Sequence, residues 1–168
     1  MRPVLVIALT LGLTACASAQ RLDAAGDVHD LLVAIRDDDQ AKFDAHVDRG
    51  ALKQEIAARL SAQAKSPNVD KSWQSLGAIL APAIADIAGD ALVQPRVFHR
   101  VAESYGYKAG TPLPNRVAIA GSLKAMEDGR VCATKTKDGP CLLIFTREAG
   151  TWKLSGFQGD LSTLRIKL

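Results

Sequence analysis

Residues 130–157, RVCATKTKDGPCLLIFTREAGTWKLSGF, decide the fold of this chain. Short runs rich in β-branched and aromatic residues alternate here with turn residues, a pattern typical of antiparallel strands joined by hairpins. The pattern predicts strands over residues 130–135, 141–146 and 151–157, with turns at Lys137-Asp138-Gly139 and Glu148-Ala149-Gly150. Residues 117–126 form either a fourth strand, which we favour, or a short helix.

Upstream of residue 108 the apolar residues recur every three or four positions, the period of helices that bury one face. Val28, Leu31 and Ile35 follow this period, and Asp27 is a suitable N-cap for them. Further helices are expected over residues 40–47, from Asp48 to the Ser66-Pro67-Asn68 stop, over the very apolar 72–93, and from Pro95 to Gly106. The expected fold is α+β, with N-terminal helices packed on a C-terminal antiparallel β-meander of three or four strands.

The N-terminus has the form of a bacterial export signal. Residues 4–13 are uncharged and largely apolar, a length that suits a signal peptide and is too short for a bilayer span. Leu13-Thr14-Ala15-Cys16 resembles the lipobox of bacterial lipoproteins, which implies lipidation of Cys16 and removal of residues 1–15. Ordinary cleavage after Ala17-Ser18-Ala19 is the alternative. We expect a tether over residues 16–26 and a single α+β domain over 27–168.

Lipidation would attach the protein to a membrane through palmitate-type acyl chains. In proteobacterial sorting an aspartate after the lipidated cysteine favours the inner membrane, and Ala17 stands at that position here. The expected location is therefore the periplasmic face of the outer membrane rather than the inner membrane.

The two remaining cysteines, Cys132 and Cys141, form an even pair flanking a predicted hairpin turn. In an oxidising compartment such a pair predicts a disulfide. Two free buried thiols are the alternative.

Composition excludes one class of partner. The formal net charge is only +3, and lysines and arginines are scattered without interleaved aromatic residues. Nucleic-acid binding is therefore not expected.

Two parts of the chain resemble an uncharacterised bacterial family. Near the start these are residues 32–39 (LVAIRDDD), His46-Val47-Asp48 and Ala51-Leu52-Lys53. Near the end it is residues 143–154 (LIFTREAGTWKL), which look like a closing hairpin with a buried tryptophan. Together they resemble the domain of unknown function 2939 over residues 28–160. The resemblance implies no activity.

Candidate chemistry is sparse. Asp86 and Asp90 lie one helical turn apart, and with Trp73 and Tyr107 they are candidates to line a ligand groove. The alternative is that both aspartates form the solvated stripe of an apolar helix, since like charges at this spacing cost only a few tenths of a kcal/mol. His29, His46 and His99 show no metal-ligand spacing, so neither a metal nor another cofactor is expected.

Two functions follow from these features. The first is a non-enzymatic, lipid-anchored binding or structural module of the envelope, with a small apolar ligand or an envelope protein as partner. The second is an envelope hydrolase that uses Asp86 or Asp90 with a histidine from another helix. The sequence contains no catalytic motif such as Gly-x-Ser-x-Gly, which favours the first.

Overall fold

The computed structural model describes residues 2–64, 83, 86–87, 89–104, 106–108, 110–136 and 139–158. Within these ranges the side chains of residues 2–16, 60, 63–64 and 104 are not described. The helices are α1 (Arg2–Asp37), α2 (Gln40–Ala45), α3 (Arg49–Ala64), α5 (Pro95–Ser104) and α6 (Arg116–Gly121). The strands are β1 (Leu123–Ala125), β2 (Val131–Thr134), β3 (Cys141–Glu148) and β4 (Thr151–Phe157).

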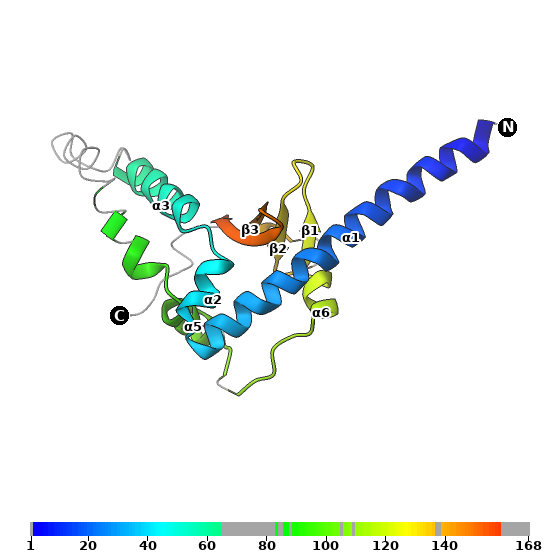
Figure 1. Cartoon of the computed structure of the whole chain (residues 1–168). Helices are drawn as coiled ribbons and strands as arrows, with labels where there is room; N and C mark the ends of the chain where they lie inside the picture. The colour runs from blue at the N-terminus through cyan, green and yellow to red at the C-terminus, as the bar shows by residue number, and fades with distance from the viewer. Residues whose placement is uncertain are drawn as a thin grey trace.

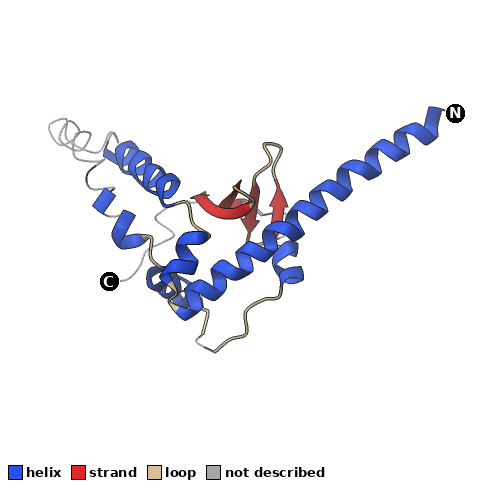
Figure 2. Cartoon of the chain, in the orientation of Figure 1, coloured by secondary structure: helices blue, strands red, loops and turns tan. Residues whose placement is uncertain are grey.

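The architecture is α+β, as the sequence predicts. The four strands form one antiparallel sheet in the order β1-β2-β3-β4, a meander in which each strand pairs with its neighbour in sequence. Helix α1 crosses one face of this sheet, with α6 beside it near β1 and with α2 and α5 at its C-terminal end (Figures 1 and 2).

The end of α1 and the two helices that follow agree with the sequence pattern. Asp38 adopts a left-handed conformation (φ 53°), and the Asp39 N–H donates to the Ala34 carbonyl, which ends α1. The Asp39 side chain then accepts a hydrogen bond from the Lys42 N–H and caps α2. Asp48 caps α3 in the same way, with its Oδ1 atom 2.9 Å from the Ala51 nitrogen.

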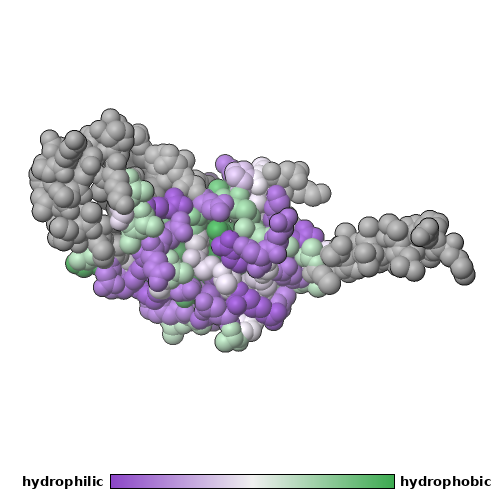
Figure 3. Space-filling view, turned by 90° about the horizontal axis from the view of Figure 1, so that it is seen from above, coloured by the Kyte–Doolittle hydropathy of each residue, from purple (hydrophilic) through white to green (hydrophobic). Residues whose placement is uncertain are grey.

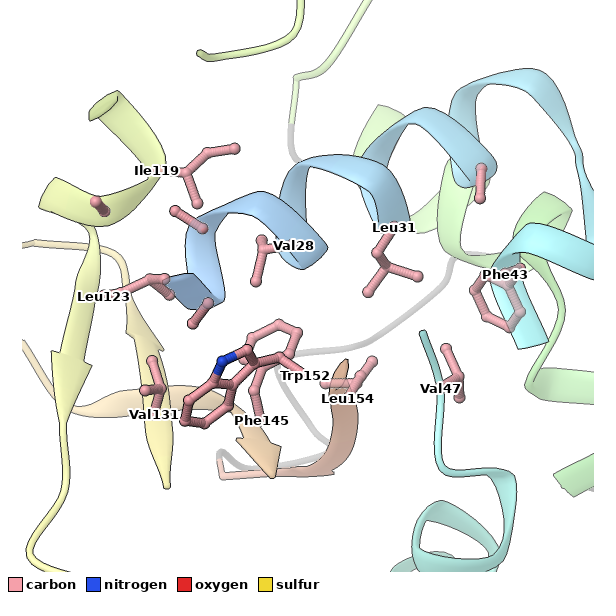
Figure 4. Packing of buried hydrophobic residues seen from close by; sticks show 14 of the residues in the cluster. Val28, Leu31, Phe43, Val47, Ile119, Leu123, Val131, Phe145, Trp152 and Leu154 are labelled. Atoms are coloured by element: carbon pink, nitrogen blue, oxygen red, sulfur yellow. The ribbon is translucent and has the colours of Figure 1, made fainter. Parts of the chain in front are cut away.

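The core lies between α1 and the sheet. Val28 and Leu31 of α1 face Phe145, Trp152 and Leu154, all of them buried (Figure 4). At the far end of α1, Phe43 of α2 is fully buried and meets Phe98 of α5 edge to face, with ring centroids 5.3 Å apart. This packing holds α2 and α5 against the end of α1.

The prediction of a tether over residues 16–26 is wrong. These residues continue α1, and Ala24 and Ala25 have no exposed surface. Two adjacent alanines keep the surface of α1 narrow, which lets α6 and the sheet approach it closely. The domain therefore begins before residue 27. Asp27 is not an N-cap for the same reason, since it lies inside α1.

The favoured strand over residues 117–126 is wrong in its first half. Asn115 caps α6 through its Oδ1 atom, 2.9 Å from the Ala118 nitrogen, so residues 116–121 are helical. Ile119 and Ala120 are both buried, which adjacent positions achieve on a helix but not on a one-sided strand. The fourth strand is present but short, starting at Leu123.

The closing hairpin forms where the sequence places it. Ala149 and Gly150 both have positive φ (48° and 91°), the conformation of a type I′ turn that matches the twist of the flanking strands. The turn predicted at Lys137-Asp138-Gly139 lies partly outside the described residues, as does most of the helix predicted over 72–93. Of that helix, residues 83, 86–87 and 89–93 are described, and all of them except Val93 are helical.

Candidate functional site

Asp86 and Asp90 share one side of their segment, as predicted, and both bind Lys53 of α3. The Lys53 Nζ atom lies 2.8 Å from an oxygen of each carboxylate, and Arg49 lies 3.6 Å from Asp90. A Cβ atom on Gly89 would overlap the Lys53 stem, so glycine allows this close approach. Both aspartate side chains remain mostly exposed. Among the described residues, their ion-pair partners are the cations Arg49 and Lys53 of α3 and include no histidine.

This ion pairing has a measurable electrostatic consequence. A hydrogen bond from Lys53, with a smaller contribution from Arg49, holds the pKa of the Asp90 carboxyl below its usual range. Because the folded pKa is lowered, the pairing stabilises the fold at pH values above the ordinary aspartate pKa. That stabilisation is lost as the pH falls through the lowered pKa.

Substituting Lys53→Met should therefore move the titration midpoint of Asp90 up toward the ordinary aspartate value. Carboxyl ¹³C NMR over a pH series measures this directly. Asp128 is the matched control, because its pKa is lowered by Arg130 and not by Lys53. A midpoint of Asp90 that does not move in the Lys53→Met variant would contradict the assigned cause.

Tyr107 follows α5, and its contacts differ from those of Asp86 and Asp90. The Tyr107 ring meets His99 of α5 edge to face at 6.0 Å, and its hydroxyl donates to the Thr111 carbonyl at 3.3 Å. Trp73, the fourth candidate, lies outside the described residues. The described members of the predicted groove are thus held by different helices.

A hollow of about 310 Å³ lies between the end of α1 and α5. Its lining is mostly charged, comprising Ile35, Arg36, Asp38, Arg96, His99, Arg100 and Glu103. The surface view likewise shows a hydrophilic exterior over most of the described face, with small apolar spots (Figure 3). Tyr107 is next to this hollow through its contact with His99.

The three arginines of the hollow differ in how they are already paired. Arg36 forms two hydrogen bonds to the Asp37 carboxylate, at 2.7 and 3.0 Å, and this pairing raises the pKa of Arg36. Arg96 donates to the Gln94 side chain at 2.8 Å. Arg100 is exposed and has no hydrogen bond or ion pair within the described part of the chain. Its guanidinium is therefore available to an incoming anion.

Sequence reasoning missed this hollow, although part of the signal was present. Arg96 and Arg100 are four residues apart on α5, while Phe98 packs against the core from the same helix. This spacing places the two arginines on one exposed stripe. The contribution of α1 could not be read from the sequence, because it depends on how α1 and α5 pack.

Two aspartates of α1 accept hydrogen bonds from Trp152 near the start of β4. The Trp152 indole Nε1–H donates to Asp23 at 2.9 Å, and the Trp152 main-chain N–H donates to Asp27 Oδ2 at 2.7 Å. His46, at the end of α2, lies near the same carboxylate, with Nδ1 3.8 Å from Asp27 Oδ1. Of the three histidines, His29 and His46 are thus brought to one region, while His99 belongs to α5.

The predicted disulfide between Cys132 and Cys141 is present and links β2 to the start of β3. Cys132 is fully buried. A loop this short contributes about 2–3 kcal/mol on a chain-entropy estimate. Cys16 lies in α1, and its side chain is outside the described set. Across the residues described in full, no helix is long and apolar enough to cross a membrane.

Comparison with known proteins identifies one family. The model of the family described as protein of unknown function (DUF2939) matches residues 9–101, more than half of the chain. The match covers the helices from α1 into α5, so the closing hairpin that also resembles the family lies outside the matched range. No curated protein and no solved structure matches the chain. The chain belongs to the DUF2939 family of proteins of unknown function.

Proposed function

We propose that this protein is a lipid-anchored binding module of the bacterial envelope that takes up an anionic group in the hollow between α1 and α5. The observation that supports anion binding is Arg100, which has no hydrogen bond or ion pair within the described residues and shares the hollow with Arg36 and Arg96. Guanidinium groups bind phosphate and carboxylate through paired hydrogen bonds. The charged lining favours an anionic ligand over the apolar ligand expected from the sequence.

The envelope half of the proposal is supported by the cysteines. Cys132 and Cys141 are joined, and structural disulfides persist in oxidising compartments. That leaves Cys16, directly after the apolar run, as the cysteine for the lipid. With Ala17 next to it, the proposed location is the periplasmic face of the outer membrane.

The hydrolase alternative receives less support. It requires Asp86 or Asp90 to face a histidine, and both instead bind Lys53. Among the described residues, neither carboxylate has a histidine as an ion-pair partner. We therefore retain the binding module.

Titration with inorganic phosphate at constant ionic strength tests the binding half. Amide signals of α5 and of the last turn of α1 should shift together and saturate. In the Arg100→Gln variant the affinity should fall about tenfold or more, since a charge-assisted hydrogen bond contributes roughly 1.5–3 kcal/mol.

Arg130→Gln is the matched control, because Arg130 is a partly exposed arginine already paired with Asp128. It should leave phosphate binding unchanged. Equal weakening in both variants would mean that phosphate meets only general positive charge, and the proposed site would be abandoned. The anchoring half is tested separately through Cys16.

A further inference from the structure

Three potential metal ligands, two from α1 and one from the residue that follows α2, lie together beside β4. Within the described residues, Asp27 and Asp30 of α1 and His46 after α2 each place one ligand atom within 4.8 Å of the other two. All three side chains are partly buried. Asp27 and Asp30 are three positions apart on one face of α1. His46 lies near them only because the chain turns back after α1.

The buried Nδ1 atom of His46 has no hydrogen-bond partner among the described residues. Its side chain is only 12% exposed, and Nδ1 is inaccessible to solvent without a hydrogen bond in the described structure. Buried polar atoms almost always have a partner, so an atom without one calls for an explanation. Asp27 Oδ1 faces this nitrogen at 3.8 Å, too far for a hydrogen bond.

That separation suits two ligands of one metal ion. With bonds of about 2.0–2.1 Å, two ligands of a tetrahedral zinc ion lie about 3.3–3.4 Å apart. Small side-chain rotations that move these atoms by a few tenths of an ångström would bring His46 Nδ1 and Asp27 Oδ1 to this separation. Asp30 needs a somewhat larger adjustment, and it is the most exposed of the three.

Strand β4 holds two of the three ligands in place. The Trp152 N–H donates to Asp27 Oδ2, which leaves Oδ1 directed at His46. The Leu154 N–H donates to the His46 carbonyl at 2.9 Å, next to the bridge between Val47 and Leu154. Figure 4 shows Val47 and Leu154 near each other below the C-terminal half of α1. Such outer contacts orient ligands in metal sites.

A second imidazole borders the same carboxylates. His29 Nδ1 is also buried without a hydrogen bond in the part of the chain described, and it lies 3.7 Å from Asp30 Oδ1. Two imidazole nitrogens without partners therefore lie next to one pair of aspartates. His29 is not in the group of ligand atoms that all lie within 4.8 Å of one another, so it borders the site without being one of its ligands.

We propose that Asp27, Asp30 and His46 bind a divalent transition-metal ion, with Zn²⁺ as the first choice. A mixed set of imidazole and carboxylate ligands suits zinc and its neighbours, whereas calcium and magnesium take oxygen ligands. Three protein ligands leave a position open for water or for an atom of a bound ligand. The ion would join α1 to the α2–α3 connection. The site is independent of the anion hollow.

The test uses the full chain with Cys16→Ser, so that no free thiol competes for the ion. Isothermal titration with ZnCl₂ should show one ion bound per chain, and a hundredfold excess over Kd should raise Tm by about 5–10 °C. CaCl₂ and MgCl₂ should do neither. His46→Gln and Asp30→Asn should each weaken zinc binding by about tenfold or more.

Asp30→Asn is the cleaner variant, because Asp30 makes no hydrogen bond to β4, so its loss should leave the fold intact by circular dichroism. Asp128→Asn, a carboxylate remote in sequence and paired only with Arg130, should bind zinc as the parent does. Zinc binding that survives both His46→Gln and Asp30→Asn would overturn the proposal. So would an absence of binding by the folded parent, since His46 and Asp27 would then form a simple ion pair.

Discussion

Replacing Cys16 with serine should abolish incorporation of radioactive palmitate and should release the protein from the membrane fraction. The reason is chemical, since the thioether to the lipid requires a thiol and a hydroxyl does not replace it. Two or three acyl chains anchor a protein almost permanently, at about 0.8 kcal/mol per buried methylene, so the effect of losing them should be complete. Palmitate labelling followed by membrane fractionation measures both changes.

The identity of the first residue of the mature protein distinguishes lipidation at Cys16 from ordinary signal-peptide cleavage after Ala19. Mass spectrometry should find acylated Cys16 as the first residue of the wild-type protein. An N-terminus at Gln20 would instead support cleavage after Ala19 and would contradict the anchor. Either cut leaves Ala24 and Ala25 in the core, so the domain should stay folded in both cases.

If the lipid is on Cys16, the domain lies close to the membrane. Cys16 and Ala24 belong to the same helix, and eight residues of α-helix span only about 12 Å. The buried part of α1 therefore begins almost at the anchor, without the flexible tether that the sequence suggested. A ligand of the domain would have to be reached near the membrane surface.

Trp152→Ala should lower the free energy of unfolding by about 3–5 kcal/mol, a large share of the stability of a domain this size. Trp152 is only 2% exposed and packs under α1, so its removal leaves a cavity between α1 and the sheet (Figure 4). The hydrogen bond from its indole to Asp23 is lost as well. Urea unfolding followed by circular dichroism measures the change.

Trp152→Phe tests how the loss divides between packing and the indole hydrogen bond. It should cost clearly less than the alanine variant, because most of the apolar contact remains. Val117→Ala is the control, since Val117 is 73% exposed and should change stability by no more than about 0.5 kcal/mol. A Trp152→Ala loss as small as that of Val117→Ala would show that Trp152 does not hold α1 on the sheet.

Features set by neighbouring residues were predicted well. The start of α3 at Asp48 and the turn at Ala149-Gly150 each depend on a few consecutive positions. The disulfide was predictable because a short hairpin brings its two cysteines together. In each case the residues that determine the feature lie within one turn or one hairpin.

Features set by burial were predicted poorly. Residues 16–26 contain small and polar residues that suit a tether. Ala24 and Ala25 are buried only because α1 packs against α6 and the sheet. Residues 117–126 carry apolar residues that fit a strand or a helix equally well. The Asn115 cap and the contact with α1 decide for helix over residues 116–121.

The α+β class, the closing hairpin, the disulfide and the family could be predicted from the sequence alone, because hydrophobic period and turns are local. Only the tertiary structure decided the candidate sites. Arg36 lines the same hollow as Arg96 and Arg100 because α1 and α5 pack together. His46 lies near Asp27 because β4 donates hydrogen bonds to both residues. Such contacts join residues far apart in sequence, and no local pattern encodes the distance between them.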